Sequence, residues 1–235
     1  MNLMATDTLA LFDLDLTLIP FDSGMAWTRF LIGRGILPVE AEDQYLAYCH
    51  QYVAGTLDIH AMHRANFQPL LRYPRATLAQ WQREFEAAIA LRLQPAALAL
   101  VRQHLQAGHL CAIVTATATL IAEPFARLFG VDHLVATLAA TSDGSPGAPF
   151  TGEFDGEPCY RHHKVTRVNR WLASHAPDAS GTPSHIGGFS KSWFYSDAIG
   201  DLPLLGAVTN PVVVRPDARL RAHALGAGWP VLDLT

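Results

Sequence analysis

The sequence predicts an α/β fold, in which helices cover both faces of a doubly wound parallel sheet and an all-helical segment is inserted near its start. From residue 94 onward, short apolar segments typical of buried strands alternate with helical segments, which is the pattern of a parallel sheet. Between the first and second of these strands, residues 20–93 show helical periodicity and no strand pattern. We therefore expect a core domain of residues 1–19 and 94–235, and a helical cap domain of residues 20–93.

The first strand ends in two carboxylates. Residues 9–12 are an apolar run typical of a strand buried on both faces, and Asp13, Asp15 and Thr17 follow at alternate positions. Alternate residues of a strand point the same way, so two such carboxylates lie together and favour a cation or a shared proton. The spacing alone is equally compatible with a structural role, in which Asp15 and Thr17 shape a turn and Asp13 caps a helix.

Four helices are expected within the cap. The first has an N-cap candidate in Asp22 or Ser23, and the second begins at Pro38, since proline is tolerated in the first turn of a helix. The predicted helices are residues 25–32, 38–52, 58–71 and 75–93. Most aromatic residues of this segment are expected to form the interior of the cap. Asp22 and Trp27 lie nearest to the first strand in sequence, so we expect these two residues to face the substrate.

The remaining chain alternates helices and strands. A turn-rich stretch at residues 142–147 predicts a β-hairpin between the strand-forming segments 134–138 and 149–154. Residues 176–192 are rich in Gly, Pro and Ser and predict a surface loop. The other predicted strands are residues 110–117, 193–195, 211–214 and 230–234, and the predicted helices are residues 96–106, 120–128, 163–174, 202–207 and 217–224.

Composition argues against several classes of protein. The chain has 235 residues, is 50% hydrophobic and carries a formal charge of −4, which suits a sizeable core and not a basic nucleic-acid-binding surface. Its three cysteines are odd in number and widely spaced, so no disulfide framework is expected. We also expect no signal peptide and no membrane-spanning helix. The expectation is a cytoplasmic protein without a nucleic-acid, membrane or obligate protein partner.

Polar residues follow three of the predicted strands. Asp13 and Asp15 follow the first, Thr115 ends the second, and Asp197 with Asp201 follows the strand at 193–195. The carboxyl ends of parallel strands meet at one edge of a sheet, where open α/β folds bind ligands. Carboxylates there can hold a hard cation such as Mg²⁺. A lysine that begins a nearby helix, Lys164, and the Thr115 hydroxyl can bind the oxygens of a phosphoryl group.

Each of these residues also has a purely structural interpretation when taken alone. Thr115 can cap the following helix, Lys164 can be a solvated surface lysine, and Asp201 can be the N-cap of the segment that begins at Leu202. Asp197 is harder to dismiss, because it ends an aromatic strand. All four structural interpretations would have to hold together, which the ordered spacing of the motifs disfavours.

This set of motifs resembles the haloacid dehalogenase superfamily of phosphohydrolases, and the helical insertion resembles the cap of its phosphoserine-phosphatase-like branch. The matching segments are residues 13–17 (DLDLT), 113–115 (IVT), Lys164 and 196–201 (SDAIGD). Gly200 departs from the pattern, because that branch commonly has Asn at this position. The resemblance implies a Rossmann-like core and a phosphatase acting on a small phosphorylated metabolite.

The resemblance also implies a role for each carboxylate. Asp13 is expected to be the nucleophile that forms an aspartyl-phosphate, and Asp15 to be the general acid and then the general base. The expected cofactor is Mg²⁺, held by Asp13, Asp15 through its backbone carbonyl, Asp197 and Asp201, with Asp201 acting either as a direct ligand or by orienting Lys164 or a water on the metal.

The phosphoryl group is expected to be bound by four residues. These are the Thr115 hydroxyl, the backbone N–H groups of Ala116 and Thr117 at the following helix start, and Lys164, which is also expected to bridge to Asp13.

Other functions use the same residues. Phosphoryl transfer to an acceptor other than water, as in a mutase, would need the same site. A phosphate-ligand binding protein without turnover would be expected to lack Asp13 or Asp15, and neither is missing. A dehalogenase would need neither the metal nor the acid at Asp15. The sequence leaves phosphoserine, histidinol phosphate and other small phosphomonoesters open as substrates.

Overall fold

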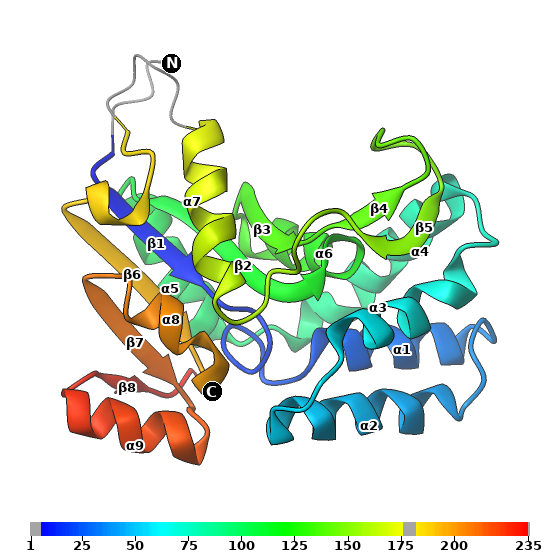
Figure 1. Ribbon diagram of the computed structural model, residues 1–235, viewed down its shortest axis with the longest axis horizontal. Helices are drawn as coiled ribbons and strands as arrows, with labels where there is room; N and C mark the ends of the chain where they lie inside the picture. The colour runs from blue at the N-terminus through cyan, green and yellow to red at the C-terminus, as the bar shows by residue number, and fades with distance from the viewer. Residues whose placement is uncertain (1–5, 176–181, 235) are drawn as a thin grey trace.

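Six parallel strands form the central sheet of the protein (Figure 1). The computed structural model describes residues 6–175 and 182–234. The strand order is β3-β2-β1-β6-β7-β8, and every neighbouring pair is parallel. The predicted doubly wound α/β fold is therefore confirmed. The strands are β1 (Thr8–Phe12), β2 (Leu110–Ala118), β3 (His133–Thr137), β6 (Lys191–Ser196), β7 (Asn210–Val214) and β8 (Val231–Leu232).

The connections of the sheet reverse direction beside β1. The chain runs from β1 outward to β2 and β3, and then returns to place β6 on the other side of β1. Phe12, the last residue of β1, pairs with Ile113 in β2 and with Tyr195 in β6. Asp13 and Asp197 therefore leave neighbouring strands near the point where the strand order reverses, which is the usual ligand site of such sheets.

Alternate residues of β1 face two hydrophobic clusters, one on each side of the sheet. Ala10 and Phe12 belong to the cluster that includes α5 (Pro95–Gln106) and α6 (Thr119–Phe129). Leu9 and Leu11 belong to the cluster that includes α7 (His163–His175), α8 (Leu202–Leu205) and α9 (Ala218–Ala227). All four residues are fully buried, which explains the continuous apolar run in the sequence.

The segment between β1 and β2 contains the four predicted helices; the first is longer than predicted and the other three are shorter. They are α1 (Ser23–Gly33), α2 (Ala41–Ala54), α3 (Ile59–Phe67) and α4 (Arg75–Ile89). Pro38 does not begin α2, because residues 38–40 form a turn before the helix. The last predicted residues of α3 and α4 form the 3₁₀ turns Gln68–Leu70 and Ala90–Arg92, the tighter geometry common at helix ends.

Helices α1 and α4 share the hydrophobic cluster of α5 and α6, which also includes Phe67, the last residue of α3. Phe85 of α4 lies 5.1 Å from Trp27 of α1 and 5.9 Å from Phe125 of α6, measured between ring centroids. Pro124 lies inside α6 and has no N–H to donate to Leu120 O four residues earlier. Gln82 of α4 donates to that carbonyl at 2.8 Å instead, which ties α4 to α6. The division into a core and a cap at residues 20–93 stays a prediction.

The predicted hairpin has a different first strand. Residues 133–137 join the central sheet as β3, with buried Val135 paired to Val114, and do not belong to the hairpin. The hairpin consists of β4 (Ala139–Thr141) and β5 (Phe150–Phe154), which pair antiparallel. Strand-forming residues continue from 134 through 141 with no turn signal between the two strands, so the sequence pattern did not separate them.

Several other predicted elements differ from the structure at their ends. Residues 176–181 of the predicted loop 176–192 lie outside the described residues, and β6 begins at Lys191, two residues before the predicted start. Within the described ranges, no helix is both long enough and apolar enough to cross a bilayer.

Candidate active site

A buried ammonium group joins two of the predicted carboxylates. Lys164 is the second residue of α7, with only 3% of its surface exposed, and its Nζ donates to Asp13 Oδ1 at 2.8 Å and to Asp201 Oδ2 at 2.6 Å. Asp201 Oδ2 also accepts from Ser196 Oγ at 2.7 Å, and Asp13 Oδ2 accepts from Thr17 Oγ1 at 3.1 Å. The structure therefore places Lys164 between the proposed nucleophile and Asp201.

The charges of this cluster influence one another. The pKa of Asp13 is raised to about 6: burial is the main cause and the Asp201 charge adds to it, while Lys164 and Thr17 oppose the rise. Burial lowers the pKa of Lys164, but Asp13 and Asp201 outweigh burial and hold that pKa well above its usual value. Lys164 is thus a fixed positive charge at neutral pH, beside a carboxylate that can serve as a nucleophile.

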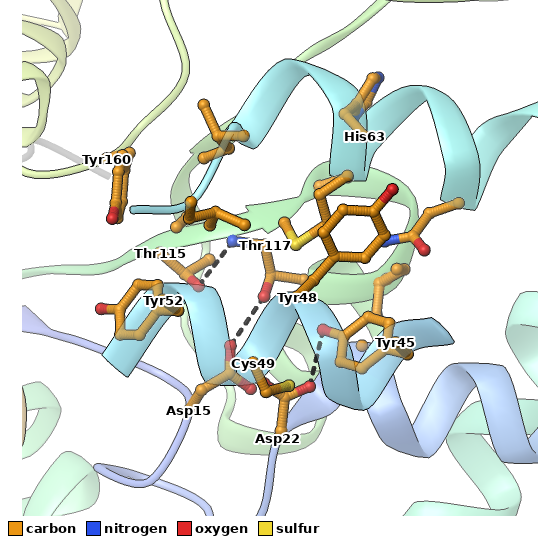
Figure 2. A pocket seen from close by; sticks show the side chains of 18 of the residues that line it. Asp15, Asp22, Tyr45, Tyr48, Cys49, Tyr52, His63, Thr115, Thr117 and Tyr160 are labelled. Atoms are coloured by element: carbon orange, nitrogen blue, oxygen red, sulfur yellow. Dashed lines mark hydrogen bonds between the residues drawn. The ribbon is translucent and has the colours of Figure 1, made fainter. Parts of the chain in front are cut away.

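Asp15 lies in a different environment from Asp13. Its Oδ2 accepts from Thr117 Oγ1 at 2.7 Å (Figure 2). Its Oδ1 accepts from the Ser23 N–H at 2.5 Å. Burial raises the pKa of Asp15 to about 7, and the charges of Asp22 and Asp13 add to the rise. A carboxyl group whose pKa lies near neutrality can both donate and accept a proton, which is what general acid–base chemistry requires.

The end of β2 brings Thr115 and Thr117 to the same site. Thr115 is buried. Together with Ala116 and Thr117, it lines a cavity that extends from the carboxylates. The Thr117 N–H donates to Thr115 Oγ1 at 3.1 Å (Figure 2). Strand β2 continues to Ala118 and α6 begins at Thr119, so Ala116 and Thr117 lie in the irregular end of the strand. The prediction that these two residues lie at the helix start was therefore wrong.

The predicted metal ligands do not all converge. Thr17 Oγ1 contacts Asp13 Oδ2 at 3.1 Å and Asp197 Oδ1 at 3.3 Å, so these two carboxylates flank one hydroxyl. The side chain of Asp15 is bound by Ser23 and Thr117, and that of Asp201 by Lys164 and Ser196. Among the described residues, no three His, Cys, Asp or Glu side chains form a group that could hold a metal.

The donors that remain fit Mg²⁺. This ion is usually held by one or two carboxylates together with substrate phosphate and water, and not by an all-protein cage. Asp13 and Asp197 supply two hard oxygen donors, and the backbone carbonyl of Asp15 is the third candidate. Burial raises the pKa of Asp197 well above its usual value and the Asp13 charge adds to the rise, so a cation would stabilise both ionised carboxylates.

A cavity of about 290 Å³ connects these groups to α2 and α3. Its volume is near the lower end of the range for ligand pockets, about 300–1,000 Å³. Away from the carboxylates, its wall consists mainly of aromatic and apolar side chains (Figure 2). The aromatic lining residues are Tyr45, Tyr48, Tyr52, His63, Phe67, Phe154 and Tyr160.

Comparisons with known proteins identify the family. The family model for haloacid dehalogenase-like hydrolases matches residues 10–206. The chain belongs to this family. A histidinol-phosphatase of Neisseria meningitidis serogroup C is 38% identical over 227 residues, which cover 96% of this chain and 98% of that protein. The predicted assignment to a phosphohydrolase family is confirmed, and the predicted enzyme class, a phosphatase, agrees with the names of such relatives.

Solved structures support the same fold. A protein of unknown function from Bordetella pertussis Tohama I is 40% identical, with a TM-score of 0.86, and the match covers 98% of this chain and all of that one. A substrate-bound phosphoserine phosphatase has a TM-score of 0.59 at 16% identity, with 91% of this chain and 89% of that one covered. The second likeness is evidence for the fold alone.

Of the two residues predicted to face the substrate, the structure places one at the cavity of this hydrolase. Asp22 is the N-cap of α1 and lines the cavity, where its Oδ1 accepts from Tyr45 Oη at 2.8 Å (Figure 2). Trp27 does not line this cavity. It is 3% exposed and packs against Phe30 and Phe85, because its position on α1 faces the shared hydrophobic cluster.

Several residues at the site were not predicted from the sequence. Thr17 lies within the first motif, so its spacing from Asp13 was a usable signal. Ser23 was considered only as a helix cap, and its N–H binds Asp15. Tyr45 packs against Gly24, where a Cβ would clash with the tyrosine hydroxyl, so glycine permits the close approach of α1 and α2. Gly200 has Tyr52 and Arg161 as its side-chain neighbours.

Replacement of Lys164 tests the charge balance of this site. Lys164→Met should destabilise the protein in excess chelator by about 3–5 kcal/mol, because it leaves buried carboxylates without their cation. Loss of the ammonium raises the folded-state pKa of Asp13 further above its unfolded value of about 3.9. A group with a raised folded pKa loses its stabilising contribution as pH increases, so the deficit relative to wild type should widen above pH 6.

Urea unfolding at pH 5.5 and pH 8 measures this deficit. Lys191→Met is the matched control, because Lys191 is exposed on β6. Equal deficits for Lys164→Met at the two pH values would show that the lost stability does not come from the buried carboxylates.

Proposed function

We propose that this hydrolase is a Mg²⁺-dependent phosphatase that cleaves histidinol phosphate through an aspartyl-phosphate on Asp13. The observation that carries the reaction is the buried pair of Asp13 and Lys164 in the wall of the cavity, 2.8 Å apart. The name of the Neisseria meningitidis relative supports the substrate, because similarity to that histidinol-phosphatase extends over nearly the full length of both chains.

The chemistry of the cavity favours this substrate over phosphoserine. Phosphoserine carries a carboxylate, which a protein usually binds with arginine or lysine. Among the described residues that line the cavity, Lys164 is the single Lys or Arg, and its ammonium is bound to Asp13 and Asp201. Histidinol phosphate has no carboxylate and carries an imidazole in its place, beside the amine that both compounds share.

Both of these groups have suitable partners in the cavity. The imidazole can stack on the tyrosine rings of α2, and the ammonium can pair with the Asp22 carboxylate beside Tyr45. Burial lowers the pKa of His63 to about 4, so this lining residue is neutral and adds no positive charge. The cavity therefore offers an aromatic surface and one acidic group to the organic part of the substrate.

The proposed reaction has two steps. Asp13 attacks phosphorus and the bond to the alcohol oxygen breaks, while Asp15 donates a proton to the departing oxygen. Asp15 then accepts a proton from water, whose oxygen attacks the aspartyl-phosphate and releases phosphate and free Asp13. Lys164 and the Thr115 hydroxyl bind the phosphoryl oxygens during both steps. Mg²⁺, when bound at Asp13, Asp197 and the Asp15 carbonyl, offsets negative charge on the phosphoryl group.

Removal of the metal should abolish turnover. In the proposed complex, Asp13, Asp15 and Asp197 would surround a substrate dianion with Lys164 as the compensating charge among the cavity-lining residues, so a further cation is expected. Phosphate release should fall to background in excess chelator and recover with Mg²⁺. Ca²⁺ should not restore it, since its looser coordination misaligns the nucleophile. Undiminished turnover of p-nitrophenyl phosphate in chelator would refute this requirement.

The two carboxylates of the first motif should fail in different ways. Asp13→Asn removes the nucleophile, so no phospho-enzyme can form and activity should be undetectable. Asp15→Asn keeps the nucleophile but removes the proton donor and acceptor, a loss of typically about 10²- to 10⁴-fold. With p-nitrophenyl phosphate, whose leaving group needs little protonation, the first step should survive and phospho-enzyme should accumulate.

Intact-mass spectrometry after rapid quenching distinguishes the two variants. A phosphate adduct on Asp13→Asn, or none on Asp15→Asn under single-turnover conditions, would reverse the two roles.

Activity with substrates that carry an amine should depend on Asp22. Wild-type kcat/KM should be higher for histidinol phosphate than for phosphoserine. Asp22→Asn should lower the value for histidinol phosphate by about 10- to 100-fold, the effect of losing a charge-assisted hydrogen bond of about 1.5–3 kcal/mol. Turnover of p-nitrophenyl phosphate, which lacks the amine, should fall by a smaller factor, set by the loss of the Asp22 charge near Asp15.

Trp27→Phe is the control, because Trp27 packs away from the cavity. This substitution should affect thermal stability without changing the ratio of kcat/KM for histidinol phosphate to that for p-nitrophenyl phosphate. A higher rate with phosphoserine than with histidinol phosphate would overturn the substrate assignment.

A further inference from the structure

The segment that joins β7 to α9 contacts the first catalytic loop. Arg215 Nη2 donates to Leu16 O and to Thr17 O, each at 3.0 Å. Arg215 Nη1 is buried and makes no hydrogen bond to any residue that the structure describes. Within the described residues, the Arg215 guanidinium therefore donates its hydrogen bonds to the loop that carries Asp13 and Asp15.

The same segment also contacts the second catalytic loop. The Asp217 N–H donates to Asp197 O at 3.0 Å. Asp217 Oδ2 accepts from the Ile199 N–H at 2.9 Å, while Asp217 Oδ1 caps α9. Residues 215–217 are therefore hydrogen-bonded to the loop after β1 and to the loop after β6, the two loops that supply the candidate metal ligands.

Backbone conformation supports a positioning role for this contact. Leu16 has φ 57° and Arg215 has φ 43°, both in the left-handed region of backbone conformation, which residues other than glycine rarely adopt. Such conformations cost of order 1–3 kcal/mol each and persist where surrounding contacts fix them. Leu16 and Arg215 are joined by one of the hydrogen bonds above, so the two strained positions hold each other.

The contact leads to the catalytic carboxylates through one residue. Thr17 O is held by Arg215, and Thr17 Oγ1 contacts both Asp13 and Asp197. Asp197 is fixed separately at its own backbone by Asp217. A displacement of Thr17 would therefore change the distance between the two carboxylates.

We propose that residues 215–217 are a positioning brace, which holds Asp13 and Asp197 at the spacing that a divalent cation needs. Arg215 is the main element, because its side chain fixes the strained turn from which the Thr17 hydroxyl reaches both carboxylates. The inference rests on the proposed metal-dependent function. Residues that orient metal ligands from behind typically change metal affinity or activity by about 10- to 100-fold when mutated.

The test compares Arg215→Met with Arg215→Lys and Arg221→Met. Titration calorimetry of Mg²⁺ into chelator-treated protein measures metal affinity without substrate. For Arg215→Met, the Mg²⁺ Kd should rise about 10- to 100-fold and kcat should fall, with KM changed by less than about 3-fold. Arg215→Lys keeps a cationic donor for one carbonyl and should lie between wild type and Arg215→Met. Arg221→Met alters an exposed arginine on α9 and should match wild type.

The outcomes separate this inference from the proposed function. If wild type binds Mg²⁺ and Arg215→Met binds it equally well, even with a lower melting temperature, the contact is merely structural and the brace is wrong. If Arg215→Met does not fold, an unchanged Mg²⁺ affinity in Arg215→Lys would likewise show that the brace is wrong. If wild type itself binds no Mg²⁺, the proposed metal dependence fails and the brace fails with it.

Discussion

The ammonium group of Lys164, buried between Asp13 and Asp201, is the interaction on which the active site depends. A buried lysine is stable only when carboxylates compensate it, and here two do so at hydrogen-bond distance. Ser196, the last residue of β6, donates to Asp201, and Asp13 follows β1 directly. One hydrogen-bond network therefore joins Lys164 to the ends of both strands. The same network leaves the site short of positive charge, because Asp197 adds a further carboxylate. That imbalance is the physical reason to expect a divalent cation when a phosphate group enters.

Asp13 and Asp15 have different surroundings although they are only two residues apart. Strand β1 ends at Phe12, and the chain then turns so that Leu14 O accepts backbone hydrogen bonds from residues 17–19. Asp13 is thereby directed to Lys164, while Asp15 is directed to Ser23 and Thr117. One carboxylate lies beside a cation and the other beside neutral donors and the Asp22 charge. Burial raises the pKa of both groups, but Lys164 opposes the rise at Asp13, whereas the Asp22 charge adds to it at Asp15.

The ends of the strands could be predicted from the sequence, because an apolar run that stops at a polar residue marks the edge of a buried sheet. Asp13, Thr115 and Asp197 were found in this way, whereas Lys164 was found from its place at the start of a predicted helix. The orientation of helical residues could not be predicted equally well. Nearness to Asp13 in sequence gave no information on which side of α1 carries Trp27, and packing against Phe85 decides it.

Contacts between distant segments were also beyond the sequence pattern. Arg215 is 198 residues from Thr17, and an isolated arginine after a strand has no signal that distinguishes it from a surface residue. The split between β3 and β4 was missed for a related reason, since pairing partners and not local composition decide where one strand ends. Local patterns therefore located the chemical groups, while tertiary contacts determine which of them hold the others in place.

The helical insertion consists of two halves with different attachments. Helices α1 and α4 share the hydrophobic cluster of the sheet, and Gln82 completes the hydrogen bonding of α6. Tyr45, Tyr48 and Tyr52, by contrast, all belong to α2 and line the cavity above the carboxylates. Substitutions on α2 can therefore reshape the binding surface while the anchoring half stays constant. This separation gives descendants of the protein a route to new substrates that does not require the catalytic core to be rebuilt.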